Sequence, residues 1–290
     1  MKKIKLMTDS SADIPKTMQE TYDIEVVPLY VHFGNEQYKS GVTIDTATFN
    51  QKIKDSDDFP LSSAPGPNEF YEAFKCIDSE VPIILLAISD GISSTYNHAL
   101  LGKKMLLDEE PERKIEVINT KTASSGMILL LDEAIKKTNE GYHYEELVTH
   151  LYEKVESTIT LFVLKTVENL VRGGRLDRVK GAIVKTLNIR LLMRASEEGT
   201  IEVTEKVRGE KKSIRRFIDQ IGSYTKNVED KMLAMTHCNA EDWANHVLQE
   251  IKNVYPFKET TLAEMGPAIS THAGEGGLVI AFFKDKLNSN

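Results

Sequence analysis

Residues 81–107 read VPIILLAISDGISSTYNHALLGKKMLL, and the order of residue types in this stretch decides the expected fold. The apolar run 81–89 has the length of a strand, and an uninterrupted run of that kind is typical of a strand covered on both faces. A loop rich in hydroxyl side chains follows, and then a helix. A doubly covered strand followed by a helix indicates a largely parallel sheet with helices on both faces.

The same alternation of strand, loop and helix recurs up to about residue 155. Residues 114–120 predict another strand, and residues 124–141 and 144–158 predict helices. Farther on, short strands come in close pairs with few helices among them, which indicates an α+β unit. We therefore expect an α/β protein of two domains. Residues 1–157 would form an α/β/α domain with a largely parallel sheet, and residues 158–290 an α+β domain with a mixed sheet.

Composition limits the class of protein. Of the 290 residues 41% are hydrophobic, so a sizeable core can form. The net charge of −8 argues against a general nucleic-acid-binding protein, which needs a basic face. The two cysteines are far apart and form no CxxC motif, so the sequence predicts no metal site. Since it shows neither a signal peptide nor an apolar run long enough to span a membrane, we expect a cytoplasmic protein without integral membrane association.

Hydroxyl side chains cluster where strands are expected to end. Ser93 and Ser94, in SDGISST, stand at the start of an expected helix. Such hydroxyls are either ordinary helix caps or, with the free N–H groups of the helix, a site for a carboxylate or phosphate. The segment lacks the G-x-S-x-G motif of a serine hydrolase, because Thr95 stands where the second glycine is needed. Ser62 stands just before a Pro/Gly turn, in a loop that is expected to fold over the same edge of the sheet.

A pair of carboxylates, Asp9 and Asp13, follows the first expected strand. No third metal ligand follows at a recognisable spacing, so loop and helix-capping roles are expected for both. Asp13 in particular is expected to cap a helix with Pro15 in its first turn.

Other segments leave two interpretations open. In ISTHAGEGGLVIAFF, residues 269–283, His272 is either a structural histidine at a strand end or a residue aimed at a ligand. Basic residues are dense in 172–180 and 205–217, which favours either an anionic partner or a solvated face.

Seven segments occur in an order that strongly resembles the DegV family over nearly the whole chain. They are MTDSSADIP, SSAPGPNEF, SDGISSTYNHA, VINTKTASSGMILLLDEA, ENLVRGGRLDRVKGAIVKTLNIRLLM, EKVRGEKKSI and EMGPAISTHAGEGGLVIAFF. The resemblance implies a two-domain protein that buries one long-chain fatty acid and serves as the fatty-acid-binding subunit of a bacterial fatty acid kinase. A separate kinase subunit would supply ATP and phosphorylate the carboxylate to an acyl phosphate for phospholipid synthesis. The chain itself would need no cofactor and have no independent activity.

The resemblance also implies site residues. Ser62, Ser93 and His272 match the family's carboxylate-binding positions, and Ser94, which stands where the family usually has glycine, adds a hydroxyl beside them. Arg175, with His272, would assist phosphoryl transfer, and three arginines would dock the partner: Arg172, Arg175 and Arg208. Ser62-Ser63-Ala64-Pro65 departs from the family's Thr-Ser-Gln-Pro, although serine replaces threonine as a donor.

The chemistry of a fatty acid agrees with these residue types. A buried carboxylate needs hydrogen-bond donors, and hydroxyls, backbone N–H groups and an imidazolium are suitable. Residues 127–135 and 187–193 are apolar enough to be candidates for lining the tail. Two alternatives stay open: a stand-alone acyl hydrolase or transferase that uses Ser93 and His272, and a non-catalytic lipid-responsive regulator that docks through its basic residues.

Overall fold

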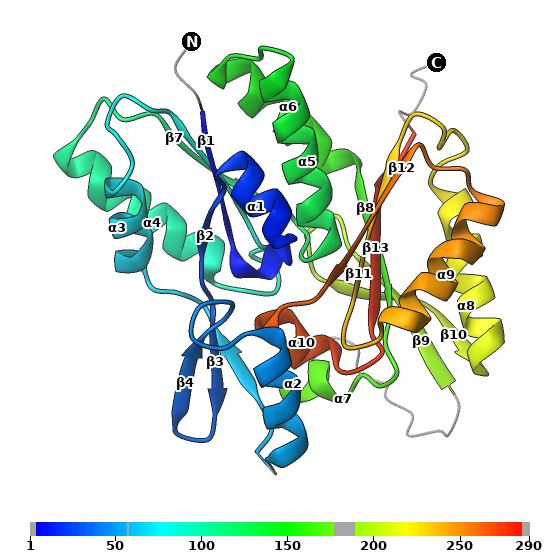
Figure 1. The fold of residues 1–290 in the computed structure, drawn as a ribbon. Helices are drawn as coiled ribbons and strands as arrows, with labels where there is room; N and C mark the ends of the chain where they lie inside the picture. Colours follow the sequence, from blue (N-terminus) through cyan, green and yellow to red (C-terminus); the bar gives the residue numbers. More distant parts are fainter. Residues whose placement is uncertain (1–3, 57, 177–188, 286–290) are drawn as a thin grey trace.

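The computed structural model describes residues 4–56, 58–176 and 189–285 (Figure 1). A first sheet contains four strands in the order β2-β1-β6-β7, and every neighbouring pair is parallel. Its strands are β1 Lys5–Asp9, β2 Glu25–Val27, β6 Ile83–Ala87 and β7 Ile115–Asn119. All residues of β6 are buried, as its uninterrupted apolar sequence predicts.

Helices cover both faces of this sheet. On the outer face lie α3 (Pro67–Lys75) and α4 (Thr95–Glu109), and on the other face α5 (Ser125–Asn139) with α6 (Tyr144–Ser157) beside it (Figure 1). The short helices η1 (Ser10–Ala12) and α1 (Lys16–Tyr22) follow β1.

A second sheet contains six strands in the order β10-β9-β8-β13-β11-β12. It is mixed, because β11 and β12 are parallel while the other neighbours are antiparallel. Helices α8 and α9 cover its outer face, and α5 packs against its inner face (Figure 1). The bounds are β8 Thr158–Val163, β9 Ile189–Ala195, β10 Ile201–Arg208, α8 Glu210–Asp219, η2 Gln220–Ser223, β11 Met232–His237, α9 Glu241–Val254, β12 Glu259–Glu264 and β13 Leu278–Phe283.

The predicted α/β fold class, with one parallel and one mixed sheet, is confirmed. The domain limits, residues 1–157 and 158–290, stay a prediction. At that point α6 ends at Ser157 and β8, the first strand of the second sheet along the chain, begins at Thr158.

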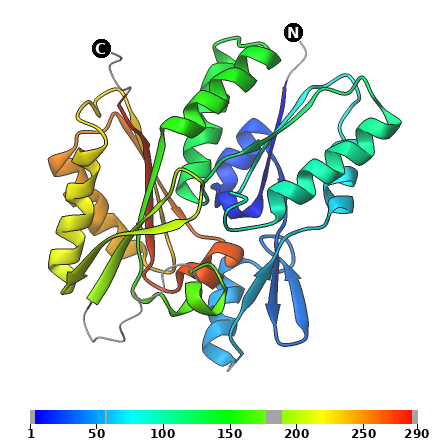
Figure 2. The same cartoon turned by 180° about the vertical axis from the view of Figure 1, so that it is seen from behind.

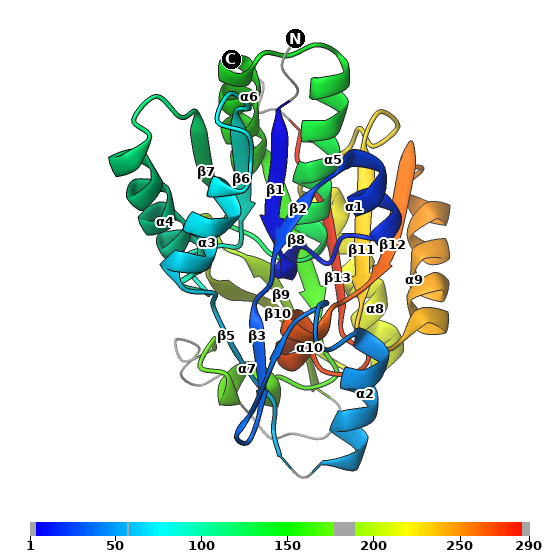
Figure 3. The same ribbon diagram turned by 60° about the vertical axis from the view of Figure 1, so that its left-hand side comes forward.

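A third, antiparallel sheet of the order β4-β3-β5 lies below the other two with α2 beside it (Figure 3). Its elements are β3 Tyr30–Phe33, β4 Glu36–Lys39, α2 Thr46–Asp55 and β5 Leu61–Ser63. The sequence predicts a loop at Ser62, whereas the structure pairs Ser62 with Val31 of β3. Three residues are too few for an apolar alternation to reveal a strand.

Two short helices, α7 (Glu168–Arg172) and α10 (Pro267–Ala273), contact each other beneath the sheets (Figure 3). His272 therefore lies in the last turn of a helix and not at a strand end. Gly266 is the N-cap of α10 and Pro267 its first residue, while Gly274, with a φ of 67°, ends it. Proline at the first helical position and glycine after the last are common helix limits.

Of the two carboxylates Asp9, the last residue of β1, and Asp13, one has the expected role. Asp9 caps η1, because its side chain accepts a hydrogen bond from the backbone N–H of Ser11. Asp13 does not cap α1, whose N-cap is Pro15 with no side-chain hydrogen bond. Its backbone is left-handed, with φ 53° and ψ 32°, and this turns its side chain toward distant parts of the chain.

Candidate ligand-binding cavity

A largely apolar cavity lies between the two large sheets, at the carboxyl ends of β6 and β7. Its empty space, which includes space open to solvent, is about 850 Å³. The carboxyl edge of a parallel sheet is where α/β proteins place ligands, as the sequence predicts. The lining residues are Leu29, Ser62, Ile88, Ile92, Ser93, Thr122, Ala123, Ser124, Thr160, Phe162, Leu164, Leu170, Arg175, Ala195, Gly199, Thr200, Ile201, Ala268, Ile269, His272, Ala273 and Val279.

Two of the predicted site residues meet directly at the polar end of this cavity. The Ser62 Oγ and His272 Nε2 atoms form a hydrogen bond of 2.7 Å, although the residues are 210 positions apart. Strand β5 carries Ser62, and α10, which contacts β5, carries His272. The pair therefore depends on the third sheet and α10 being packed together.

Ser93 reaches the same cavity from the loop between β6 and α4. Its hydroxyl is 2.8 Å from Thr95 Oγ1 and accepts a hydrogen bond from the Thr95 backbone N–H at 3.3 Å. One turn into α4, the His98 Nδ1 atom bonds the carbonyl of Pro65 at 2.7 Å. This bond fixes the loop after Ser62 against the helix that begins beside Ser93.

Arg175 is the one charged side chain among the described residues that line the cavity, since His272 is neutral as shown below. Its Nε–H donates to the carbonyl of Ile92 at 3.1 Å, and Nη1 donates to the carbonyl of Gly173. A guanidinium has five N–H donors, so these two bonds leave others for an anion. The backbone contacts hold the positive charge next to the Ser93 loop.

His272 has a lowered pKa in this structure. Burial, and secondarily the positive charge of Arg175, lowers the pKa of its imidazole to about 4. With this pKa the ring is uncharged at pH 7, and Arg175 supplies the positive charge among the described lining residues. The His272 Nδ1 atom is buried and has no hydrogen-bond partner among the residues that the structure describes, and a Cβ atom at Gly173 would lie only 2.6 Å from it. Glycine at 173 thus makes room for the ring.

The remaining lining side chains are mostly apolar, and this part of the lining is called the apolar end. Phe162 and Leu164 come from β8 and its end, Leu170 from α7, and Val279 from β13, and all four belong to one buried cluster. Leu191 and Met193 belong to the same cluster but do not line the cavity. Within the candidate tail-lining segment 187–193, they pack behind the wall, and residues 187 and 188 lie outside the described residues.

The other candidate tail-lining segment, residues 127–135, does not line the cavity. Helix α5 lies between the two large sheets, so its apolar side chains are used in both cores. Leu130 and Leu131 pack with β6 residues, whereas Ile128 and Leu129 pack with β11 and β13 residues. The apolar character of a segment predicts that it is buried, but it does not predict which part of the protein, or which ligand, packs against it.

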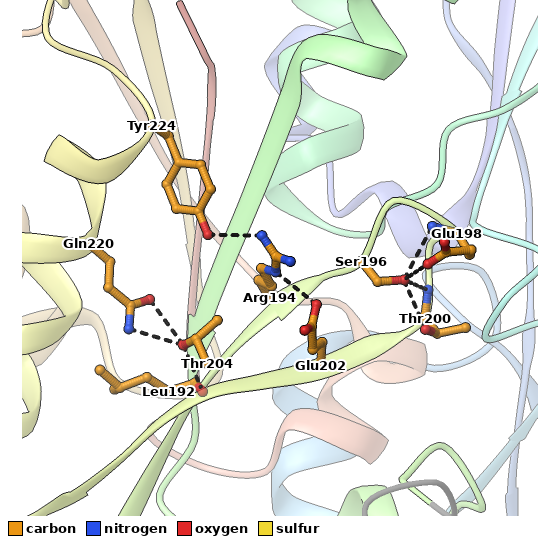
Figure 4. Close-up of polar contacts among 9 residues, drawn as sticks. All are labelled: Leu192, Arg194, Ser196, Glu198, Thr200, Glu202, Thr204, Gln220 and Tyr224. Atoms are coloured by element: carbon orange, nitrogen blue, oxygen red, sulfur yellow. Dashed lines mark hydrogen bonds and ion pairs between the residues drawn. The ribbon is translucent and has the colours of Figure 1, made fainter.

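The hairpin formed by β9 and β10 closes one side of the cavity. From behind, it reaches from the six-stranded sheet toward the first sheet (Figure 2). Ser196 orders its tip, because the Ser196 hydroxyl accepts hydrogen bonds from the backbone N–H groups of Glu198 and Thr200, both at 3.2 Å (Figure 4). At this tip, the carbonyl of Gly199 accepts a hydrogen bond of 2.7 Å from the hydroxyl of Ser89, at the end of β6.

Three other predicted residues are not brought to the cavity. Ser94 is exposed and does not line it. Arg172 bonds Glu168 at 2.7 Å and stacks its guanidinium 4.9 Å from the ring of Phe59. Arg208 is exposed at the end of β10, whose first residue lines the cavity, so about 20 Å of strand separates it from the site. The basic residues of α8 are exposed, and of these Arg216 pairs with Glu205.

Over residues 4–56, 58–176 and 189–285, no group of three or more His, Cys, Asp or Glu side chains is placed to hold a metal ion. No helix in the same ranges is long and apolar enough to cross a membrane.

Sequence reasoning missed several residues of the cavity. Thr122, Ser124 and Thr160 line it, and the Thr122 and Thr160 hydroxyls bond each other at 2.7 Å. Ser124 has φ 56° and ψ −122°, a conformation that non-glycine residues seldom adopt and that is enriched at functional sites. No sequence signal marks this backbone, because serine is common at helix starts of every kind.

Comparisons with known proteins agree with this geometry. The family model described as "Uncharacterised protein, DegV family COG1307" matches residues 3–285. A DegV domain-containing protein of Caldanaerobacter subterraneus is 30% identical over 287 residues, which cover 99% of this chain and 100% of the relative. A crystal structure of a DegV family protein from Ruminococcus gnavus, refined with vaccenic acid, is 28% identical, with a TM-score of 0.90 and coverage of 97% and 100% of the two chains. The Streptococcus pneumoniae fatty acid kinase B3 protein, loaded with linoleic acid, is also 28% identical, with a TM-score of 0.86 and coverage of 97% and 99%.

Proposed function

The chain belongs to the DegV family, and from this premise we propose that it binds one long-chain fatty acid and presents its carboxylate to a separate kinase. The observation that carries the proposal is the division of one cavity into a polar end and an apolar end. Ser62, Ser93, Arg175 and His272 converge at the first, and aliphatic and aromatic side chains form the second. Similar proteins of this family hold vaccenic and linoleic acid.

The two ends have different energetic roles. A carboxylate removed from water is costly unless donors replace the water, and charge-assisted hydrogen bonds are the strong ones. Arg175 supplies the charge, and the hydroxyls supply neutral donors. Each buried methylene contributes about 0.8 kcal/mol, so a long acyl tail contributes on the order of 10 kcal/mol before ordering costs. The tail provides most of the affinity, and the polar end fixes its direction.

A neutral His272 suits this arrangement. With its proton on Nε2, the ring donates to Ser62 Oγ, which leaves the Ser62 hydroxyl proton free for the fatty-acid carboxylate. In the proposed reaction a carboxylate oxygen attacks the γ-phosphorus of ATP held by the partner kinase. A bond forms between this oxygen and phosphorus, the bond between the β-γ bridging oxygen and the γ-phosphorus breaks, and ADP leaves. This chain positions the nucleophile, and the kinase supplies the nucleotide.

The alternative of a stand-alone acyl hydrolase has less support. His272 bonds Ser62 and not Ser93, so the expected pair of nucleophile and base is not formed. An effective pair needs a third group that orients the base, yet the His272 Nδ1 atom has no hydrogen-bond partner in the described structure. A ring with a pKa of about 4 is also a weak general base at neutral pH.

Native mass spectrometry of the gently purified protein tests the proposal. We expect one long-chain fatty acid per chain and, after delipidation, uptake of palmitate or oleate in preference to the alcohol of the same length. A protein that stays empty and takes up neither acid contradicts it. The kinase step is tested with a fatty acid kinase catalytic subunit, ATP and the loaded protein. Acyl phosphate should form with the wild type and should decrease strongly in Ser93→Ala and Ser62→Ala.

A further inference from the structure

One buried carboxyl group joins two walls of the cavity without lining it. Asp13 Oδ1 accepts a hydrogen bond from the backbone N–H of Gly266 at 2.8 Å, and Asp13 Oδ2 accepts one from the hydroxyl of Ser124 at 2.5 Å. Asp13 is buried, and its left-handed backbone directs both oxygens away from its own helix. The two partners are 253 and 111 positions away in the sequence. The carboxyl group is therefore a long-range link and not a local cap.

The first partner controls the helix that carries His272. Gly266 is the N-cap of α10, which has only seven residues. His272 follows six residues later, which is about 9 Å along a helix axis. Because so short a helix moves as a unit, a displacement of its first turn displaces the imidazole. Ser40 also holds this turn, since its hydroxyl accepts a hydrogen bond from the Ala268 N–H at 3.2 Å.

The second partner is part of the cavity wall. Ser124 lines the cavity in its unusual backbone conformation. The Ser124 N–H donates to the carbonyl of Ser11 at 2.8 Å, and the Ser124 hydroxyl is 2.7 Å from Thr236 Oγ1 on β11. This network connects η1, the start of α5 and the second sheet. Ser124 is thus held in place by its own hydrogen bonds, and it anchors the Asp13 carboxyl group that bonds the N-cap of α10.

We propose that Asp13 is a positioning residue that sets the place of His272 relative to the opposite wall at Ser124. The inference rests on the proposed function, because the position of His272 matters only if the Ser62–His272 pair receives a carboxylate. Asp13 touches neither the fatty acid nor the kinase. It preorganises the polar end, so its loss affects recognition of the acid group and not burial of the tail.

The protonation state of Asp13 suggests a matched variant. Burial raises the pKa of its carboxyl group to about 8, against the lowering effect of its hydrogen bonds. At neutral pH the group is therefore mostly protonated, and its O–H then donates to the Ser124 hydroxyl in the same contact. The asparagine side chain of an Asp13→Asn variant is also neutral and has the same size. Its amide oxygen accepts from Gly266, and its amide N–H₂ donates to the Ser124 hydroxyl. The removal variant is Asp13→Gly, because alanine would be strained at a φ of 53°.

The experiment measures the affinity of delipidated wild type, Asp13→Asn, Asp13→Gly and Ser40→Ala for palmitate and for hexadecanol at pH 7. For Asp13→Gly we expect about 10-fold weaker binding of palmitate and less than about 2-fold weaker binding of hexadecanol. Asp13→Asn should bind both ligands within about 2-fold of the wild type. Ser40→Ala removes one bond to the same helix turn but leaves the link to Ser124, so we expect a change of less than about 3-fold.

A second measurement follows the imidazole itself. In ¹⁵N spectra of the empty protein, the His272 ring signals should shift in Asp13→Gly and match the wild type in Asp13→Asn. Equal losses for acid and alcohol, or unchanged palmitate binding in Asp13→Gly, overturn the inference while leaving the proposed function intact. Wild type that binds neither ligand contradicts the proposed function itself. If Asp13→Gly does not fold, palmitate binding more than about 10-fold weaker in Asp13→Asn, with His272 ring signals that match the wild type, overturns the inference, because the position of the imidazole would then not control recognition.

Discussion

The two ends of the cavity are built in opposite ways. At the polar end, four side chains from β5, the β6–α4 loop, the turn after α7 and α10 line one cavity, and each is held by individual hydrogen bonds. At the apolar end, β8, β10, β13 and α7 contribute apolar side chains that pack against one another through buried surface. These side chains form no directional hydrogen bonds. A polar end fails when one atom is displaced, whereas an apolar end tolerates exchanges of similar volume. Selectivity for an acid should therefore reside in few residues, and affinity for a tail in many.

The largest effect is expected from the charge at the polar end. Arg175→Gln should weaken binding of palmitate about 100-fold, because a buried carboxylate then has no compensating charge. Arg175→Lys keeps the charge without the planar fork and should give an intermediate loss. Isothermal titration of delipidated protein measures both, with hexadecanol as the ligand that should be unaffected. Palmitate affinity equal to the wild type in Arg175→Gln would show that the polar end does not recognise charge.

A smaller effect is expected from the space beside the imidazole. In Gly173→Ala the new Cβ atom would lie 2.6 Å from His272 Nδ1, so the ring must shift, which disturbs its hydrogen bond with Ser62. We expect about 10-fold weaker palmitate binding. The matched control is a double-mutant cycle with His272→Ala, in which the methyl group has no ring to displace. Equal losses from Gly173→Ala in both backgrounds would place its effect elsewhere than at His272.

The smallest effect is a pH dependence of stability. The folded pKa of His272 is about 4, below its ordinary value of 6.5, so the unfolded chain binds more protons between these values. Stability contributed by the neutral ring is present above pH 6.5 and is lost as the pH falls toward 4. Relative to His272→Gln, the wild type should lose about 1 kcal/mol of unfolding free energy between pH 7.5 and 5.5. Denaturant titrations measure this difference, in which contributions from other groups cancel. A difference that does not change with pH would mean an ordinary pKa in the folded protein.

Sequence patterns predict the parts of this molecule in which one residue type repeats over several turns or a whole strand. The apolar run of β6 and the helices α5 and α6 are of this kind. The meeting of Ser62 with His272 follows from the family resemblance and not from periodicity. Helix α10 is short and rich in small residues, and β5 has three residues, so neither carries a period that sequence can show.

The remaining parts depend on tertiary packing. The cap role predicted for Asp13 was wrong because a left-handed backbone sends its carboxyl group to Gly266 and Ser124 instead. Residues 127–135 are as apolar as a tail-lining segment should be, yet two sheets bury them. An apolar side chain has several partners of equal chemistry, and only the assembled layers decide among them.

The position of α5 has a consequence for how the chain can be divided. One face of the helix packs against the parallel sheet through Leu130 and Leu131. Another face packs against the mixed sheet through Ile128 and Leu129. A fragment that stops at Ser157 would keep the helix but expose the second face to water, at a cost of about 1.5 to 3 kcal/mol for each large side chain uncovered. Separate expression of the halves should therefore yield aggregation-prone fragments. Engineered versions of this protein need both halves in one polypeptide.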